Sequence, residues 1–215
     1  MTPPTLRPPP CSLYLITPPL AAADALGFAR VFAEVLSAAP AASVLVKLAH
    51  GSEGGAKAIV APLLKIAVAG NCALILDRDP RLAARLGADG VHVEGSSLAL
   101  DEALESLKPE RIVGSGALRL RDEAMTAGEK GADYVMFGEP AGGAPGLKLE
   151  ALIERVAWWA EIFETPCVAY AQSIDAGGAL ARAGADFIAL EGAIWDAPAP
   201  AEAARRALAD LTSEA

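Results

Sequence analysis

The sequence has few cysteines, few positive charges and no long apolar run, and each shortage argues against a class of protein. Among its 215 residues the three cysteines, Cys11, Cys72 and Cys167, have no metal-site spacing, so we expect free, buried thiols in a reducing cytoplasm. The sequence has 18 lysines and arginines and 27 aspartates and glutamates, which gives a formal net charge of −9. That charge repels nucleic-acid phosphates. No apolar run is long enough to span a membrane, and no charged-then-apolar leader opens the sequence. We therefore expect a cytoplasmic protein that binds neither nucleic acid nor membrane.

One sequence motif occurs three times: Gly-Ala-Asp, then a short apolar run, then a glutamate. It reads RLGADGVHVEG, KGADYVMFGE and RAGADFIALEG in the three copies. Each copy predicts a helix that ends at the glycine, a turn through Ala-Asp, and a buried strand of four or five residues. The acids that close the three copies are Glu94, Glu139 and Glu191.

The rest of the sequence continues the same alternation of apolar strand and helix-like segment. The expected strands are 12–17, 43–48, 72–76, 90–93, 111–115, 133–137, 166–170 and 186–190. The expected helices are 21–38, 53–69, from Pro80 to about 86, 98–107, 120–130, 148–163, 174–183 and 200–211. Eight apolar strands, each followed by a helix, predict an α/β protein with a closed, parallel (β/α)₈ TIM barrel. We assign this single domain to 12–215, and we expect the proline-rich residues 1–11 to form a disordered arm.

In such a barrel the functional side chains lie at the carboxyl ends of the strands, which places a small-molecule ligand at that rim. Each polar residue there also has a structural interpretation. Lys47 could extend along the rim to solvent, and Asp77 or Asp79 could cap the next helix. His92 could be a hydrogen-bonded core residue. The rim glutamates could be solvated, or they could form an acidic mouth that raises their pKa values or attracts a cation.

Four stretches together resemble the thiamine-phosphate synthase and thiazole tautomerase superfamily, in the family's order and over about 12–195. They are LYLIT, LILDRDPRLAARLGADGVHVEG, IVGSGALRLRDEAMTAGEKGADYVMFGEP and the segment from PCVAY to GAIW. The resemblance implies a barrel fold. It also implies a transferase of thiamine biosynthesis that joins hydroxymethylpyrimidine diphosphate to thiazole phosphate, with release of pyrophosphate and help from Mg²⁺. Self-association is also implied, and we expect the helix with Trp158 and Trp159 to form the interface.

The residues that bind diphosphate and metal in the family are mostly replaced here. At the second strand only Lys47 keeps a positive charge. At the third strand Asp77 stands at the family's asparagine and Arg78 at its metal-binding aspartate, and a shift of one residue would let Asp77 or Asp79 serve. With Glu94, these acids are the expected metal ligands. Ser97 stands at a further metal-binding acid of the family.

The later loops depart in a similar way. Gly146 stands where the family has a pyrophosphate-binding lysine, and Lys148 is the nearest substitute. Glu139 stands at the tautomerase's catalytic histidine, and Ala171-Gln172 replaces a phosphate-binding Gly-Gly. We therefore expect substrate or phosphate contacts from a set of five residues: Lys47, Ser115, Lys148, Gln172 and Gly192.

Three functional hypotheses follow from this mixture of a kept scaffold and an altered rim. The first is a diverged thiamine-phosphate synthase with the metal and phosphate residues just named. The second is a relative with different small-molecule chemistry, in which His92, Glu139 and Glu191 act as acid and base. The third is a non-catalytic binding or regulatory barrel. In any of the three, the glycine-rich segment 139–146 could be a hinged lid or an irregular loop.

Overall fold

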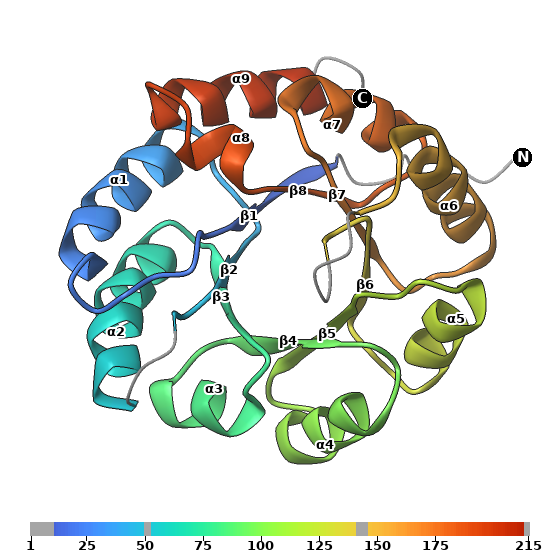
Figure 1. Ribbon diagram of the computed structural model, residues 1–215, viewed down its shortest axis with the longest axis horizontal. Coiled ribbons are helices and arrows are strands. Elements are labelled where there is room, and N and C mark those ends of the chain that lie inside the picture. The colour runs from blue at the N-terminus through green and yellow to red at the C-terminus, as the bar shows by residue number, and fades with distance from the viewer. Residues whose placement is uncertain (1–10, 50–52, 141–145, 213–215) are drawn as a thin grey trace, which may run out of the picture.

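The structure is a computed structural model that describes residues 11–49, 53–140 and 146–212. Its strands form a ring and its helices surround them (Figure 1). The strands are β1 Ser12–Ile16, β2 Ser43–Val46, β3 Ala73–Asp77, β4 Gly90–Glu94, β5 Ile112–Gly116, β6 Tyr134–Phe137, β7 Cys167–Tyr170 and β8 Phe187–Leu190. The helices are α1 Ala25–Ala38, α2 Glu53–Ala69, α3 Pro80–Leu86, α4 Leu98–Leu107, α5 Arg121–Glu129, α6 Leu149–Ile162, α7 Ile174–Arg182, α8 Gly192–Trp195 and α9 Pro200–Thr212.

The sheet is a closed barrel in which every strand pairs in parallel with its neighbours in the sequence. The ring is completed by β1 and β8, where Ser12 lies opposite Phe187 and Leu15 opposite Leu190. This arrangement confirms the predicted (β/α)₈ barrel. Because all eight strands run the same way, their carboxyl ends gather at one mouth.

Alternation along the strands divides the core into two parts. One side of each strand packs against the helices, as Leu13, Leu15 and Val113 do. The other side fills the barrel interior with a smaller cluster that contains Tyr14, Ile16, Leu45, Ile75, Tyr134, Met136, Val168 and Ala189. Since side chains alternate with a period of two, the next inward positions towards the mouth are those of Lys47, Asp77 and His92.

The aspartate of each repeated Gly-Ala-Asp motif accepts a hydrogen bond from the backbone of the preceding strand. The carboxylates of Asp89, Asp133 and Asp186 accept the backbone N–H of Leu74, Val113 and Cys167 at 2.7, 2.7 and 2.8 Å. The glycines before them have positive φ angles of 76, 97 and 103°, a conformation that glycine adopts without strain. The motif therefore joins neighbouring strands at the amino-terminal end of the barrel, opposite the mouth.

Two findings bear on the predictions from composition. No helix among the described residues is long and apolar enough to cross a membrane. The three cysteines are free thiols, Cys72 and Cys167 are buried, and burial raises the pKa of each of the three to about 12. The residues 1–11 that we expected to be a disordered arm lie, except for Cys11, outside the described residues.

Candidate functional site at the barrel mouth

Ionisable and hydroxyl side chains from most of the strands meet at the carboxyl ends of the barrel. Lys47, Asp77 and Glu191 reach the mouth because they continue the inward-facing register of Leu45, Ile75 and Ala189 in the interior cluster. The register pairs Val46 with Leu76, so the residues that follow, Lys47 and Asp77, are neighbours. In the same way Asp77 lies opposite His92.

Lys47 is held by a carboxylate from the last strand of the barrel. Its Nζ lies 3.1 and 3.0 Å from Oε1 and Oε2 of Glu191. Tyr170 donates a longer hydrogen bond of 3.4 Å to the same carboxylate. Lys47 and Glu191 are only 29 and 21% exposed, so solvent screens the pair partly. The positive charge of Lys47 is therefore balanced by Glu191, and the lysine side chain is still accessible from the mouth.

Arg78 bridges two carboxylates of neighbouring strands. Its Nε lies 3.2 Å from Asp77 Oδ2, and its Nη2 lies 2.9 Å from Glu94 Oε1. Burial raises the pKa of Asp77, while the charges of Arg78 and Lys47 act to lower it. The guanidinium thus occupies the space between two of the residues that we expected to bind metal.

Below the mouth, His92 is part of a buried chain of hydrogen bonds. Its Nδ1 lies 3.0 Å from the hydroxyl of Tyr134, which lies 2.7 Å from the hydroxyl of Tyr14. Burial lowers the pKa of His92 to about 3, and the positive charges of Lys47 and Arg78 add to this shift. The imidazole is therefore neutral at physiological pH, with one nitrogen bound to Tyr134 and Nε2 on the opposite side of the ring.

Glu139 lies beside the other edge of this imidazole. Its Oε1 accepts a hydrogen bond from the backbone N–H of Ala117. A Cβ placed on Gly116 would collide with both Glu139 Oε1 and His92 Nε2, so the bare backbone of Gly116 makes room for the two side chains to lie together. Burial raises the pKa of Glu139 to about 7, an effect that the N–H groups of Ala117 and Glu139 itself partly offset. This carboxyl can therefore gain or lose a proton near neutrality.

The structure does not bring every predicted site residue into this mouth. Asp79 caps α3, where its Oδ1 accepts the N–H of Leu82 at 2.8 Å, as the structural interpretation predicted. Ser115 is buried on the outward side of β5 and donates to the carbonyl of Gly95 at 2.8 Å. Lys148 and Gln172 are exposed, before α6 and after β7, and Gly192 begins the short helix α8.

These residues do not fit the magnesium site that the resemblance implies. Among the residues that the structure describes, no three His, Cys, Asp or Glu side chains are grouped so that they could hold a metal ion. Asp77 and Glu94 share Arg78, and Asp79 is engaged at the start of α3. A divalent ion between Asp77 and Glu94 would meet a positive charge already in place.

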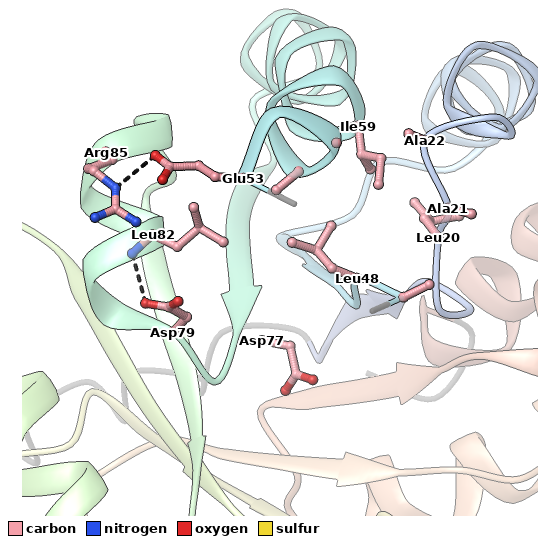
Figure 2. A pocket seen from close by; sticks show the side chains of 13 residues that line it. Leu20, Ala21, Ala22, Leu48, Glu53, Ile59, Asp77, Asp79, Leu82 and Arg85 are labelled. Atoms are coloured by element: carbon pink, nitrogen blue, oxygen red, sulfur yellow. Dashed lines mark hydrogen bonds and ion pairs between the residues drawn. The ribbon is translucent and has the colours of Figure 1, made fainter. Parts of the chain in front are cut away.

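A cavity of about 600 Å³ opens beside the mouth. It lies between the segment after β1, the start of α2 and helix α3 (Figure 2). Leu20, Leu48, Ile59 and Leu82 line it together with Asp77, and the ion pair of Glu53 with Arg85 spans 3.0 Å at its edge. Because Asp77 also contacts Arg78, the cavity adjoins the charged part of the mouth.

Sequence reasoning missed three members of this site. Tyr14 and Tyr134 were treated only as parts of strands, and Gly116 was given no role in the site. The signal that could have found them is the alternation of β5 and β6: Gly114 and Gly116 face inward, where a Cβ would collide with Tyr134 and with His92. A pair of glycines at inward positions indicates that large side chains from neighbouring strands cross there.

A closed parallel barrel with its ionisable side chains gathered at the carboxyl ends defines the class of (β/α)₈-barrel proteins. Within that class, a sequence model of the family described as thiamine monophosphate synthase matches residues 13–194. The chain therefore belongs to the thiamine monophosphate synthase family.

Two relatives support this assignment along nearly the whole chain. The thiamine-phosphate synthase of Rhodospirillum centenum is 40% identical over 197 residues, which cover 90% of this chain and 94% of the relative. The thiamine-phosphate synthase of Hyphomonas neptunium is 34% identical over 207 residues, which cover 91 and 92%.

Solved structures support the fold. The thiamine phosphate pyrophosphorylase of Pyrococcus furiosus superposes with a TM-score of 0.80 at 22% identity, over 94% of this chain and 96% of that one. The 3-hexulose-6-phosphate synthase of Salmonella typhimurium reaches a TM-score of 0.70 at 16% identity, over 95 and 100%. At these identities the likeness concerns the barrel alone.

Proposed function

We propose that this protein joins hydroxymethylpyrimidine diphosphate to thiazole phosphate and releases pyrophosphate, as a thiamine-phosphate synthase. The observation that carries the proposal is the 40% identity to the Rhodospirillum centenum synthase over 90% of the chain and 94% of that relative. The family match over residues 13–194 runs from β1 to beyond β8 and therefore includes the strand ends that form the mouth. We place the reaction at that mouth, and we propose that the protein acts in the cytoplasm.

In this reaction the carbon–oxygen bond to the diphosphate breaks, and the oxygen keeps the electron pair. The same carbon forms its new bond to the thiazole. Negative charge therefore grows on the leaving diphosphate, and fixed cations that contact it lower the barrier. Lys47 and Arg78 are suited to this task because they follow neighbouring strands, β2 and β3, and the charges of both act on the carboxyl of Asp77.

The buried floor of the mouth can form hydrogen bonds with a pyrimidine ring. His92 is neutral, and Glu139 has a pKa of about 7, so the two groups together offer hydrogen-bond donors and acceptors. We propose that they orient the pyrimidine, while the thiazole phosphate contacts the later part of the rim. The residues proposed for that phosphate are Lys148, Gln172 and Gly192.

A second candidate function is acid–base chemistry on another small molecule. The observation that favours it is Glu139, whose carboxyl titrates near pH 7 beside a neutral imidazole. Groups with pKa values near the working pH are the most effective general acids and bases. In this case Glu139 and His92 would exchange protons with the ligand, with Glu191 as a third candidate.

Calorimetric titration distinguishes these functions. The full chain is titrated with thiazole phosphate, pyrophosphate and hydroxymethylpyrimidine diphosphate, with and without Mg²⁺. The synthase proposal expects heat with all three, and a pyrophosphate affinity at least about tenfold lower in Lys47→Ala. Absence of heat and of any thermal shift with the three ligands would remove the synthase and leave the second candidate.

A further inference from the structure

We propose that the guanidinium of Arg78 occupies the place of the magnesium ion at this mouth, so that the protein binds diphosphate without a divalent metal. The proposal deepens the synthase function and rests on it for the identity of the natural ligand. What it adds is a binding residue and an independence from metal.

The guanidinium of Arg78 lies between two carboxylates. It contacts Asp77 at 3.2 Å and Glu94 at 2.9 Å, and so joins the ends of β3 and β4. A metal ion bound by two carboxylates would lie between the same oxygens. Arg78 therefore supplies one fixed positive charge at a point where two negative charges converge.

The backbone around Arg78 forms a strained turn that holds this residue in place. The N–H of Asp79 donates to the carbonyl of Asp77 at 2.9 Å, and Arg78 between them has a φ of 67°. A three-residue turn with this sign of φ is uncommon and strained for a residue other than glycine. The N–H of Arg78 is fixed in turn by the carbonyl of His92 at 2.7 Å. Strain of this kind persists where the surroundings impose it, and it concentrates at functional sites.

The guanidinium of Arg78 has more N–H donors than its two carboxylate partners use. A guanidinium carries five N–H groups in a planar fork that matches phosphate oxygens. Asp77 and Glu94 engage its Nε and Nη2, and the side chain is 65% exposed. Further N–H groups are therefore accessible to a ligand. Lys47 follows the neighbouring strand, so a diphosphate can contact two cations at once.

The test needs variants that remove the charge but keep the turn. Asparagine and aspartate tolerate positive φ better than other residues apart from glycine, so Arg78→Asn and Arg78→Asp suit this position. Arg81→Gln, an exposed arginine on α3, is the matched control. Thermal melts establish that each variant is folded. The probes are inorganic pyrophosphate in the presence of a chelator, followed by calorimetry, and Mn²⁺ alone, followed by electron paramagnetic resonance.

The proposal expects wild type and Arg81→Gln to bind pyrophosphate in chelator with equal affinity. Arg78→Asn should bind it at least about tenfold more weakly, because two carboxylates lose their counter-charge as well. Wild type should not bind Mn²⁺, whereas Arg78→Asp should bind it and should bind pyrophosphate better when the metal is added.

Three results would overturn the proposal: pyrophosphate binding by wild type only when a metal is present, unchanged binding in Arg78→Asn, or Mn²⁺ binding by wild type that Asp77→Asn abolishes. Product formation by wild type is measured separately. If thiamine phosphate forms only with Mg²⁺, the synthase function stands and the role of Arg78 is wrong. If pyrophosphate binds without metal but no product forms, the anion site stands and the synthase function is wrong.

Discussion

The ammonium group of Lys47 lies 3.0 Å from Oε2 of Glu191, and this contact joins the end of β2 to the end of β8 past the intervening β1. The positive charge of Lys47 is thus neutralised by Glu191, the glutamate that closes the third copy of the Gly-Ala-Asp motif. A diphosphate that binds Lys47 must compete with Glu191 or lie beside it. The pair therefore sets how strongly the mouth attracts anions.

Removal of the acid should strengthen anion binding. In Glu191→Gln the charge of Lys47 is no longer balanced, so the affinity for pyrophosphate should rise about three- to tenfold. Lys47→Ala should lower it instead. Calorimetry measures both, and Glu202→Gln, which breaks the surface pair of Glu202 with Arg205, is the matched control. Weaker pyrophosphate binding in Glu191→Gln would show that the carboxylate orders the lysine rather than masks it.

The buried hydroxyl of Tyr134 should matter for stability. Tyr134→Phe leaves the hydroxyl of Tyr14 and Nδ1 of His92 without their partner. A buried polar group without a partner costs about 1–3 kcal/mol, and a chain of this size loses roughly 2–4 °C of melting temperature per kcal/mol. Calorimetric melts measure the shift. Tyr170→Phe, which loses only the 3.4 Å contact to Glu191, should melt close to wild type, and equal shifts in the two variants would contradict this account.

Glu139 should make stability depend on pH. Its pKa is raised from 4.5 to about 7 in the folded chain, so between these values the folded chain binds more protons than the unfolded chain. The free energy of unfolding should therefore fall as pH rises through this window, by at most about 1.4 kcal/mol per unit of pKa shift. Glu139→Gln should lose this slope.

Denaturant unfolding of wild type and Glu139→Gln from about pH 5 to about pH 8 measures the effect. As pH rises, the free energy of unfolding of wild type should fall relative to that of Glu139→Gln. Parallel pH profiles for the two proteins would mean that Glu139 has an ordinary pKa.

Substitution of an aspartate of the repeated Gly-Ala-Asp motif should lower stability and leave ligand binding unchanged. Asp186→Ala removes the acceptor for the N–H of Cys167 at the amino-terminal end of the barrel. Because Asp186 is exposed, we expect a loss of about 1 kcal/mol in the free energy of unfolding. Urea unfolding measures this loss, and pyrophosphate affinity should equal that of wild type. A change in affinity would show that the two ends of the barrel are coupled.

Most of the fold could be predicted because each strand is a short apolar run between clear turn and cap signals. The helices expected at 53–69 and 98–107 have the observed bounds, α2 Glu53–Ala69 and α4 Leu98–Leu107. The short helix α8, Gly192–Trp195, was missed because four residues hold no helical period. The lid question concerns the 139–146 loop, of which 141–145 lie outside the described residues.

The site was harder to predict because its contacts join residues far apart in the sequence. The rim positions of Lys47, Asp77, Glu94 and Glu191 followed from strand ends. Their pairing did not, since it depends on barrel register and side-chain reach. Ser115 shows the limit most clearly: a shift of one residue along β5 places a side chain outside the barrel instead of inside it.

The central claim is tested most directly by product formation. The full chain is incubated with hydroxymethylpyrimidine diphosphate and thiazole phosphate, in chelator and in Mg²⁺, and both thiamine phosphate and pyrophosphate are quantified. The account predicts equal amounts of the two products from wild type and little from Lys47→Ala. Neither product under either condition, from protein that is folded and binds pyrophosphate, would contradict it.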